Sequence, residues 1–382
     1  MASDVPSDPG FHAEASAEGS GSELAAGGLG IRRRFRPVEE VVHLPHVMVD
    51  GAPLPASAVT LSHWPQSTTP PELARDLSVQ IAFAYLGLER APSSCPPRLR
   101  TLLAAGSGAE AVTNDHYDED GLMSVLTLVD PELALEHEEL MVAVAACGDF
   151  GVLPRDPELA ARAATAAFAI GPLADSLVGA VAGAGERYLA VLPSARELLA
   201  NPGRFEALVA DELASLSISQ ATLSGGKVEL DEDHALDLAV IEVPGAGSGG
   251  GQELHPVALR SATGCSRLLV ISGSRVWLEL RYESWVRYVS RRVPLRPDLA
   301  PLAAELSSLE PGGVRWMAEG VGAIVCRLEP EDGSTDLAPS EVVARVRAHL
   351  ARAPGAWDPF RPGGPHLPAR RQRTGRWPRA AR

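Results

Sequence analysis

The stretch AVTNDHYDEDGLMSV, residues 111–125, decides how we expect the chain to fold. An apolar run ends in Asn114, Asp115 and His116, further acidic residues follow, and Gly121 precedes a new helical pattern. This order predicts a strand, then a loop, then a helix that begins near Leu122. In open α/β sheets, ligands collect beyond the carboxyl ends of the strands, which is where this loop would lie. The stretch therefore predicts both a fold and a position for a site.

The segments on either side of this stretch repeat the same order of elements. β-rich runs at 41–49 and 58–64 precede a helix signal at 68–88, in which we expect Thr69 to cap the first turn. A further helix is expected from Asp130 to Gly148, and residues 157–216 have a helical pattern broken at Gly171-Pro172. Alternating strands and helices imply an α/β fold with a largely parallel sheet and flanking helices.

The pattern changes near residue 219 and becomes rich in strands, with Gly273-Ser274 as a hairpin turn. We therefore predict four parts, namely a disordered leader (1–35), an α/β domain with the HYDEDG loop (36–218), a smaller C-terminal α+β domain (219–355) and a basic disordered tail (356–382). The glycine-rich run 245–251 is interpreted as a flexible loop, because no lysine follows it.

Charge and composition exclude several classes of protein. The formal net charge of −15 argues against a general nucleic-acid-binding surface, although a small anion held through a metal is compatible with it. The four cysteines form no CxxC pair, which indicates neither a zinc ribbon nor a redox motif and favours a reducing cytoplasm. Neither a secretory leader nor a run of about 18 to 20 apolar residues is present, so no membrane contact is expected.

The acidic loop has the composition of a metal site. His116, Asp118 and Asp120 alternate, so in a locally extended loop they would point the same way and share one cation. Packing this many carboxylates into one turn is costly unless a divalent cation neutralises them. The alternative interpretation is a solvated turn whose carboxylates cap the following helix.

HYDEDGLMS also resembles the first motif of the DHH phosphoesterases, a His-x-Asp-x-Asp-Gly loop between a strand and a helix. The resemblance implies that His116, Asp118 and Asp120 bind Mn²⁺ or Mg²⁺, and that a metal-bound hydroxide attacks a phosphoester or phosphoanhydride. Asp149, in CGDFG, could supply the second aspartate of that superfamily, or it could be a cap or turn residue. The name-giving Asp-His-His triplet and the Gly-Gly-Gly-His substrate loop are absent.

More of the chain resembles a bacterial family of unknown function. The resemblance runs from LSHWPQSTTPPELARDLS through HYDEDGLMS to LRYESWVRYVSRR and LRPDLAPLAAEL. It implies no mechanism, but it suggests that His63 and the arginines near 281 have taken over roles of the missing residues.

Three further residues are candidates, each with a structural alternative. His63 lies at another expected strand end and, with His116, is a candidate catalytic group, or it is a half-buried structural histidine. His255 follows the glycine-rich loop and either contacts substrate or lies at the surface before Pro256. Arg281 begins RYESWVRYVSRR, which either binds a phosphate or base, or forms a helix whose buried stripe includes Tyr282, Trp285 and Val289.

These observations favour a cytoplasmic, metal-dependent phosphoesterase-like protein that acts on a small phosphorylated or nucleotide-like ligand. One alternative is a non-catalytic protein that keeps the fold and binds a nucleotide or a partner, which the absence of the Asp-His-His triplet supports. Another is a structural interaction protein whose acidic loop only caps a helix.

Overall fold

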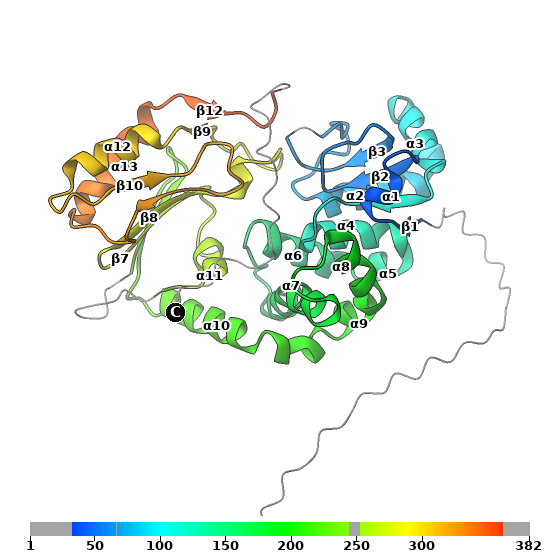
Figure 1. Cartoon of the computed structure of the whole chain (residues 1–382), viewed down its shortest axis with the longest axis horizontal. Coiled ribbons are helices and arrows are strands. Elements are labelled where there is room, and N and C mark those ends of the chain that lie inside the picture. Colours follow the sequence, from blue (N-terminus) through cyan, green and yellow to red (C-terminus); the bar gives the residue numbers. More distant parts are fainter. Residues whose placement is uncertain (1–32, 66, 244–252, 362–382) are drawn as a thin grey trace, which may run out of the picture. The chain divides into compact units, whose positions relative to one another are not determined.

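A four-stranded parallel sheet organises the first half of the chain (Figure 1). The computed structural model describes residues 33–65, 67–243 and 253–361. The strand order is β1-β4-β2-β3, with bounds β1 Arg34–Phe35, β2 His46–Val49, β3 Ser57–Leu61 and β4 Ala111–Thr113. Each pairing is parallel. The α/β fold with a parallel sheet and flanking helices is therefore confirmed.

Strands β4, β2 and β3 lead to the candidate site, and β2 lies between the other two. It pairs with β4 through Met48 and Thr113 and with β3 through Val49 and Leu61. Its four residues are all buried, as expected for a parallel strand covered on both faces. Because the three strands are parallel neighbours, the residues that follow them meet at one edge of the sheet.

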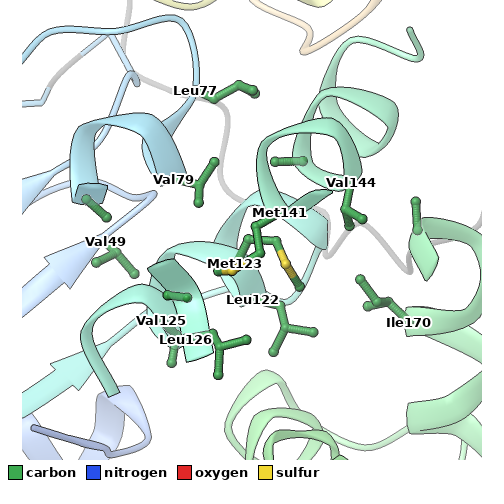
Figure 2. Packing of buried hydrophobic residues seen from close by; sticks show 14 of the residues in the cluster. Val49, Leu77, Val79, Leu122, Met123, Val125, Leu126, Met141, Val144 and Ile170 are labelled. Carbon is green, nitrogen blue, oxygen red and sulfur yellow. The ribbon is translucent and has the colours of Figure 1, made fainter. Parts of the chain in front are cut away.

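Helices α2 (Ser78–Arg90) and α4 (Glu119–Val129) pack beside this sheet, and α6 (Glu138–Asp149) packs against both helices. Figure 2 shows Leu122, Met123 and Leu126 of α4 among side chains of α2 and α6, including Val79 and Met141. These side chains are at most 3% exposed, and full burial of each contributes about 1.5–3 kcal/mol. The remaining helices of this half are α1 Val38–Val41, α3 Arg100–Ser107, α5 Pro131–Glu136, α7 Pro157–Val178, α8 Ala184–Val191, α9 Ala195–Ala200 and α10 Ala210–Ser224.

Two glycines allow close approach around the start of α4. A Cβ on Gly121 would lie 2.4 Å from Asn114 Nδ2 and 2.5 Å from the Tyr188 hydroxyl. A Cβ on Gly148, in α6, would lie 2.5 Å from Cβ of Glu119. The second contact brings the end of α6, with Asp149, against the first turn of α4.

The helix expected over 68–88 begins about ten residues later, at Ser78. Thr69 does not cap it, because its hydroxyl donates to the carbonyls of Thr60 and Ser62 and accepts from the Ser62 N–H. The first N–H groups of α2, on Ser78 and Val79, bind instead to the carboxylate of Asp120. A cap from a residue distant in sequence therefore sets the start of this helix.

The second half of the described chain contains a six-stranded mixed sheet in the order β10-β11-β8-β7-β6-β5. Its strands are β5 Glu229–Asp233, β6 Leu238–Val243, β7 Arg267–Ser272, β8 Arg275–Leu280, β10 Trp316–Ala318 and β11 Cys326–Pro330. A two-stranded sheet joins β9 Arg296–Pro297 to β12 Gly355–Trp357, and the helices are α11 Pro256–Ser261, α12 Ala300–Leu309 and α13 Pro339–Arg352. The hairpin at Gly273-Ser274 forms as expected, with φ of +63° at Gly273.

Several local features differ from the sequence-based expectation. Helix α7 continues through Pro172, since most residues around that position are buried in the core. Residues 281–292 form a one-turn 3₁₀ helix, η5 (Tyr282–Ser284), followed by turns, so the expected helical stripe is wrong and Val289 is 43% exposed.

The ends of the expected leader and tail include ordered strands, because Arg34–Phe35 forms β1 and Ala356 and Trp357 belong to β12. Residues 1–32 of the leader, residues 362–382 of the tail and the glycine-rich run 245–251 lie outside the described residues. Hydrophobic clusters are centred on each half, but Trp285 and Trp357 join the cluster of the first, and the domain boundary at residue 219 stays a prediction. Within the described ranges no helix is long and apolar enough to cross a membrane.

Candidate metal centre

Three neighbouring strand ends supply the centre of a buried cluster of carboxylates and imidazoles. Asp50 directly follows β2, His63 follows β3 by two residues, and His116 follows β4 by three. Because β2 lies between β3 and β4, Asp50 lies between the two histidines. Asp50 has φ of +45°, a left-handed conformation that aspartate tolerates better than most residues.

The Asp50 carboxylate faces both imidazoles, one with each oxygen. Its Oδ1 lies 3.5 Å from His63 Nε2, and its Oδ2 lies 3.1 Å from His116 Nε2. The Ser78 hydroxyl donates to Oδ1 at 2.7 Å. The Asp50 side chain is 1% exposed, so these neighbours, rather than water, solvate its carboxylate.

His63 presents Nε2 to the cluster because its other ring nitrogen is occupied. Nδ1 lies 2.5 Å from the Asp76 carbonyl, an acceptor only, so Nδ1 carries the proton and the neutral ring has its lone pair on Nε2. Asp149 Oδ2 and Asp120 Oδ2 lie 3.4 Å and 3.9 Å from Nε2. A histidine fixed through one nitrogen, with the other facing carboxylates, has the arrangement of a metal ligand.

His116 has the same arrangement on the other side of Asp50. Its Nδ1 lies 3.1 Å from Asp115 Oδ1, and its Nε2 lies 2.9 Å from Asp118 Oδ2. Its backbone N–H donates to Asn114 Oδ1, which fixes the turn after β4. The carboxylate of Asp115 can orient the ring while Nε2 faces Asp50 and Asp118.

Asp118 and Asp120 each combine a helix cap with a place in the cluster. Asp118 is the N-cap of α4, and its Oδ1 accepts from the Gly121 N–H at 2.9 Å. Asp120 accepts from the Ser78 and Val79 N–H groups at 2.7 and 2.8 Å. The predicted alternation along an extended loop is wrong, because α4 has already begun at Glu119. Asp118 therefore joins His116, and Asp120 joins His63.

Two groups of three side chains have ligand atoms within 4.8 Å of one another: Asp50, His63 and Asp120, and Asp50, His116 and Asp118. Separations of this size suit oxygen and nitrogen ligands that surround one cation at about 2.0–2.2 Å. Asp50 belongs to both groups. This chemistry of carboxylates and neutral imidazoles fits a divalent metal such as Mn²⁺.

The pKa values of His116 and Asp120 are raised, whereas the pKa of His63 is lowered. Burial opposes protonation of His116, but the carboxylates of Asp118 and Asp50 raise its pKa well above its ordinary value. Burial and the Asp50 charge raise the pKa of Asp120 well above its ordinary value, against the two N–H donors of α2. Burial lowers the pKa of His63, against the Asp50 carboxylate. The raised pKa values of His116 and Asp120 reflect buried negative charge, which a bound cation would neutralise.

Residues from the second half of the chain form one wall of the cluster. The Tyr282 hydroxyl lies 3.3 Å from His63 Nε2, and the Arg287 N–H donates to the His63 carbonyl. The Trp64 ring lies 5.0 Å from the His116 ring and 5.4 Å from the Trp285 ring. These aromatic side chains are at most 8% exposed, so they restrict water around the histidines.

The predicted site residues are therefore partly brought together. His63, His116, Asp118, Asp120 and Asp149 share one cluster through the contacts above. Arg281 is used elsewhere, because its guanidinium donates to the carbonyls of Cys265 and Phe150 and pairs with Glu283. Through Phe150 it anchors the residue next to Asp149 rather than reaching into the cluster.

His255 also has another use. It is the N-cap of α11, where its Nδ1 accepts from the Val257 N–H and its Nε2 lies 2.9 Å from Glu212 Oε1. Conversely, sequence reasoning missed Asp50. The signal was available, because Asp50 and Gly51 directly follow the apolar run HVMV and therefore lie at a strand end, like the residues that were chosen.

Comparison with known proteins identifies one family. A profile of a family of unknown function, DUF6687, matches residues 31–360. No curated protein and no solved structure matches the chain.

Proposed function

We propose that the chain, which belongs to the family of unknown function DUF6687, is a metal-dependent, phosphoesterase-like hydrolase of a phosphoester or phosphoanhydride. The observation that carries this proposal is the position of Asp50 between two imidazoles, each of which faces a further aspartate. This arrangement supports two adjacent cation sites with one shared carboxylate, a design found in many phosphate-transferring enzymes.

The residues of the two sites divide between the two groups. Asp50, His63 and Asp120, with Asp149 beside His63, would hold one cation, and Asp50, His116 and Asp118 would hold the other. Imidazole ligands favour Mn²⁺ over Mg²⁺, because Mg²⁺ prefers oxygen ligands. When bound, such ions polarise phosphoryl oxygens, neutralise charge that develops during displacement and lower the pKa of water.

The protein's own groups would position the substrate and exclude water. The Trp64 indole N–H is buried and has no hydrogen-bond acceptor among the described residues. It is a donor that a phosphoryl oxygen next to His116 would satisfy. The Tyr282 hydroxyl lies beside His63 at the edge of the cluster. The surrounding aromatic rings lower the local dielectric and strengthen these contacts.

Specific observations also favour the two alternatives. A non-catalytic binding protein is supported by the missing Asp-His-His triplet, because that triplet belongs to the resemblance from which hydrolysis was inferred. A purely structural role is supported by the use of Asp118 and Asp120 as helix caps. A ligand for the centre is expected to be small and phosphorylated or nucleotide-like. The four cysteines are buried free thiols, which supports a cytoplasmic location as part of the same proposal.

Hydrolysis of bis(p-nitrophenyl) phosphate and p-nitrophenyl phosphate, with and without Mn²⁺, tests the proposal. We expect Mn²⁺-dependent turnover in the parent and a loss of at least about 100-fold in Asp50→Asn, because that residue serves both sites. Asp156→Asn is the matched control, since Asp156 caps α7 through Leu159 and is not part of the cluster. Equal turnover in Asp50→Asn would refute the assignment, and Mn²⁺ binding without turnover would favour the binding protein.

A further inference from the structure

A pocket adjoins the segment that forms the wall of the candidate metal centre. Its cavity of about 460 Å³ is lined by residues 283, 284, 286, 288, 289 and 291–295 and by Pro359 and Phe360. This volume lies in the range of pockets that hold cofactors and nucleotide-sized ligands. Tyr282, which contacts His63, directly precedes the first lining residue, Glu283. One residue of the pocket lining is therefore adjacent in sequence to a residue that contacts the cluster.

Glu283 brings a buried hydrogen-bond acceptor to this pocket. The residue is 5% exposed, and its Oε1 lies 2.7 Å from Arg281 Nη2. Its Oε2 is buried and has no hydrogen-bond partner among the described residues. Oε1 pairs with Arg281, so Oε2 is an acceptor that a ligand with an amino or hydroxyl group would satisfy. Leaving such an oxygen unpaired is unfavourable, and this points to a ligand that donates a hydrogen bond.

Two aromatic rings and two arginines belong to the pocket lining, and most of the other lining residues are aliphatic. Tyr288 is half-buried and Phe360 is 51% exposed, so both rings can contact a planar group. The guanidinium of Arg291 lies 5.7 Å from the Tyr288 ring centre, and that of Arg287 lies 5.7 Å from the Phe360 ring centre. Arg292 is exposed and lines the same pocket. Stacking surfaces with positive charge favour a planar ring that carries an anionic group.

We propose that this pocket binds the base of a nucleoside phosphate, with an amino group of the base donating to Glu283 Oε2. The ring would stack on Phe360, and Arg292 would attract the phosphate. A nucleoside phosphate would be the substrate class of the proposed hydrolase, so hydrolysis of its phosphate rests on the proposed function. Binding of the base, however, depends on the pocket alone.

Calorimetric titration of the full chain with AMP, CMP, GMP and UMP tests this inference, with ribose 5-phosphate as the ligand that lacks a base. Titrations are made in EDTA and in Mn²⁺. At least one nucleotide is expected to bind about tenfold or more tightly than ribose 5-phosphate, as base stacking implies. Phe360→Ala should remove most of this preference without changing the affinity for ribose 5-phosphate. Leu177→Ala, which truncates an equally exposed apolar residue outside the pocket, should preserve it.

A second variant, Glu283→Gln, should also reduce the preference for a nucleotide. Because Glu283 is buried, this substitution can prevent folding, and Phe360→Ala then provides the test. The inference is overturned if no nucleotide binds more tightly than ribose 5-phosphate, or if Phe360→Ala leaves the preference intact. Separate titration with Mn²⁺ alone distinguishes the two proposals. Mn²⁺ binding without a nucleotide preference refutes the pocket only, whereas a nucleotide preference without Mn²⁺ binding supports the pocket and refutes the metal centre.

Discussion

Asp120→Asn distinguishes a metal ligand from a helix cap, because Asp120 has the geometry of both. In the metal-free protein the substitution has two opposing effects. Carboxylate oxygens of Asp50 and Asp120 lie within 4.8 Å of each other, and at that separation removing one of two charges relieves about 3.5 kcal/mol of repulsion at an effective dielectric of about 20. An amide cannot accept from both the Ser78 and Val79 N–H groups, and the lost bond costs about 1.5–3 kcal/mol. We therefore expect the metal-free stability to change by less than about 2 kcal/mol.

The gain in stability on adding Mn²⁺ distinguishes a metal ligand from a helix cap, because only the loss of a ligand reduces this gain. At a free Mn²⁺ concentration of about 100 times Kd, the parent should gain about 2.7 kcal/mol in free energy of unfolding. Even replacing a residue that only orients a metal ligand weakens binding about 10- to 100-fold. If Asp120→Asn weakens binding by about 100-fold, the gain at the same concentration falls to about 0.4 kcal/mol.

Urea unfolding in EDTA and in Mn²⁺ measures both quantities. Asp156→Asn is the control, because Asp156 also caps a helix but lies outside the cluster, and it should keep the full gain. A parent that Mn²⁺ does not stabilise would refute the reasoning. So would an Asp120→Asn variant that gains as much as the parent, which would leave Asp120 as a cap only.

Three further predictions follow from the same contacts. The raised pKa values of Asp120 and His116 mean that the native state binds more protons than the unfolded state, so the metal-free protein should lose stability as pH rises above about 4 for Asp120 and about 6.5 for His116. Urea midpoints in EDTA should therefore be lower at about pH 8.5 than at about pH 6, and Mn²⁺ should reverse the trend. Gly121→Ala should destabilise by about 1–3 kcal/mol through contact with Asn114 and Tyr188, whereas Gly87→Ala, with nothing within 4 Å, should stabilise by up to about 1 kcal/mol in thermal unfolding. If the protein is a hydrolase, Trp64→Phe should keep the ring contact with His116 but lower kcat/KM about tenfold, because it removes one buried donor.

Local sequence signals were enough to predict the parallel sheet and most of the cluster. The apolar run before Asn114 and the helical pattern after Gly121 placed HYDEDG at a strand end, which β4 and α4 confirm. The rule that strand ends meet at one edge explains why His63 and His116 were both candidates. The same rule applied to HVMV would have selected Asp50.

Long-range contacts explain what the sequence could not predict. The start of α2 depends on a cap from Asp120, which lies about 40 residues away, and no local pattern near Thr69 contains that information. The central position of Asp50 depends on the strand order β4-β2-β3, which differs from the order along the chain. The contact between Tyr282 and His63 joins residues separated by 219 positions.

Anomalous diffraction at the manganese edge, from crystals of the full chain grown or soaked with Mn²⁺, tests the central claim most directly. The account predicts two peaks, one on each side of the Asp50 carboxylate, with His63 and Asp120 around one and His116 and Asp118 around the other. A crystal saturated with Mn²⁺ that shows no peak beside Asp50 would contradict the account.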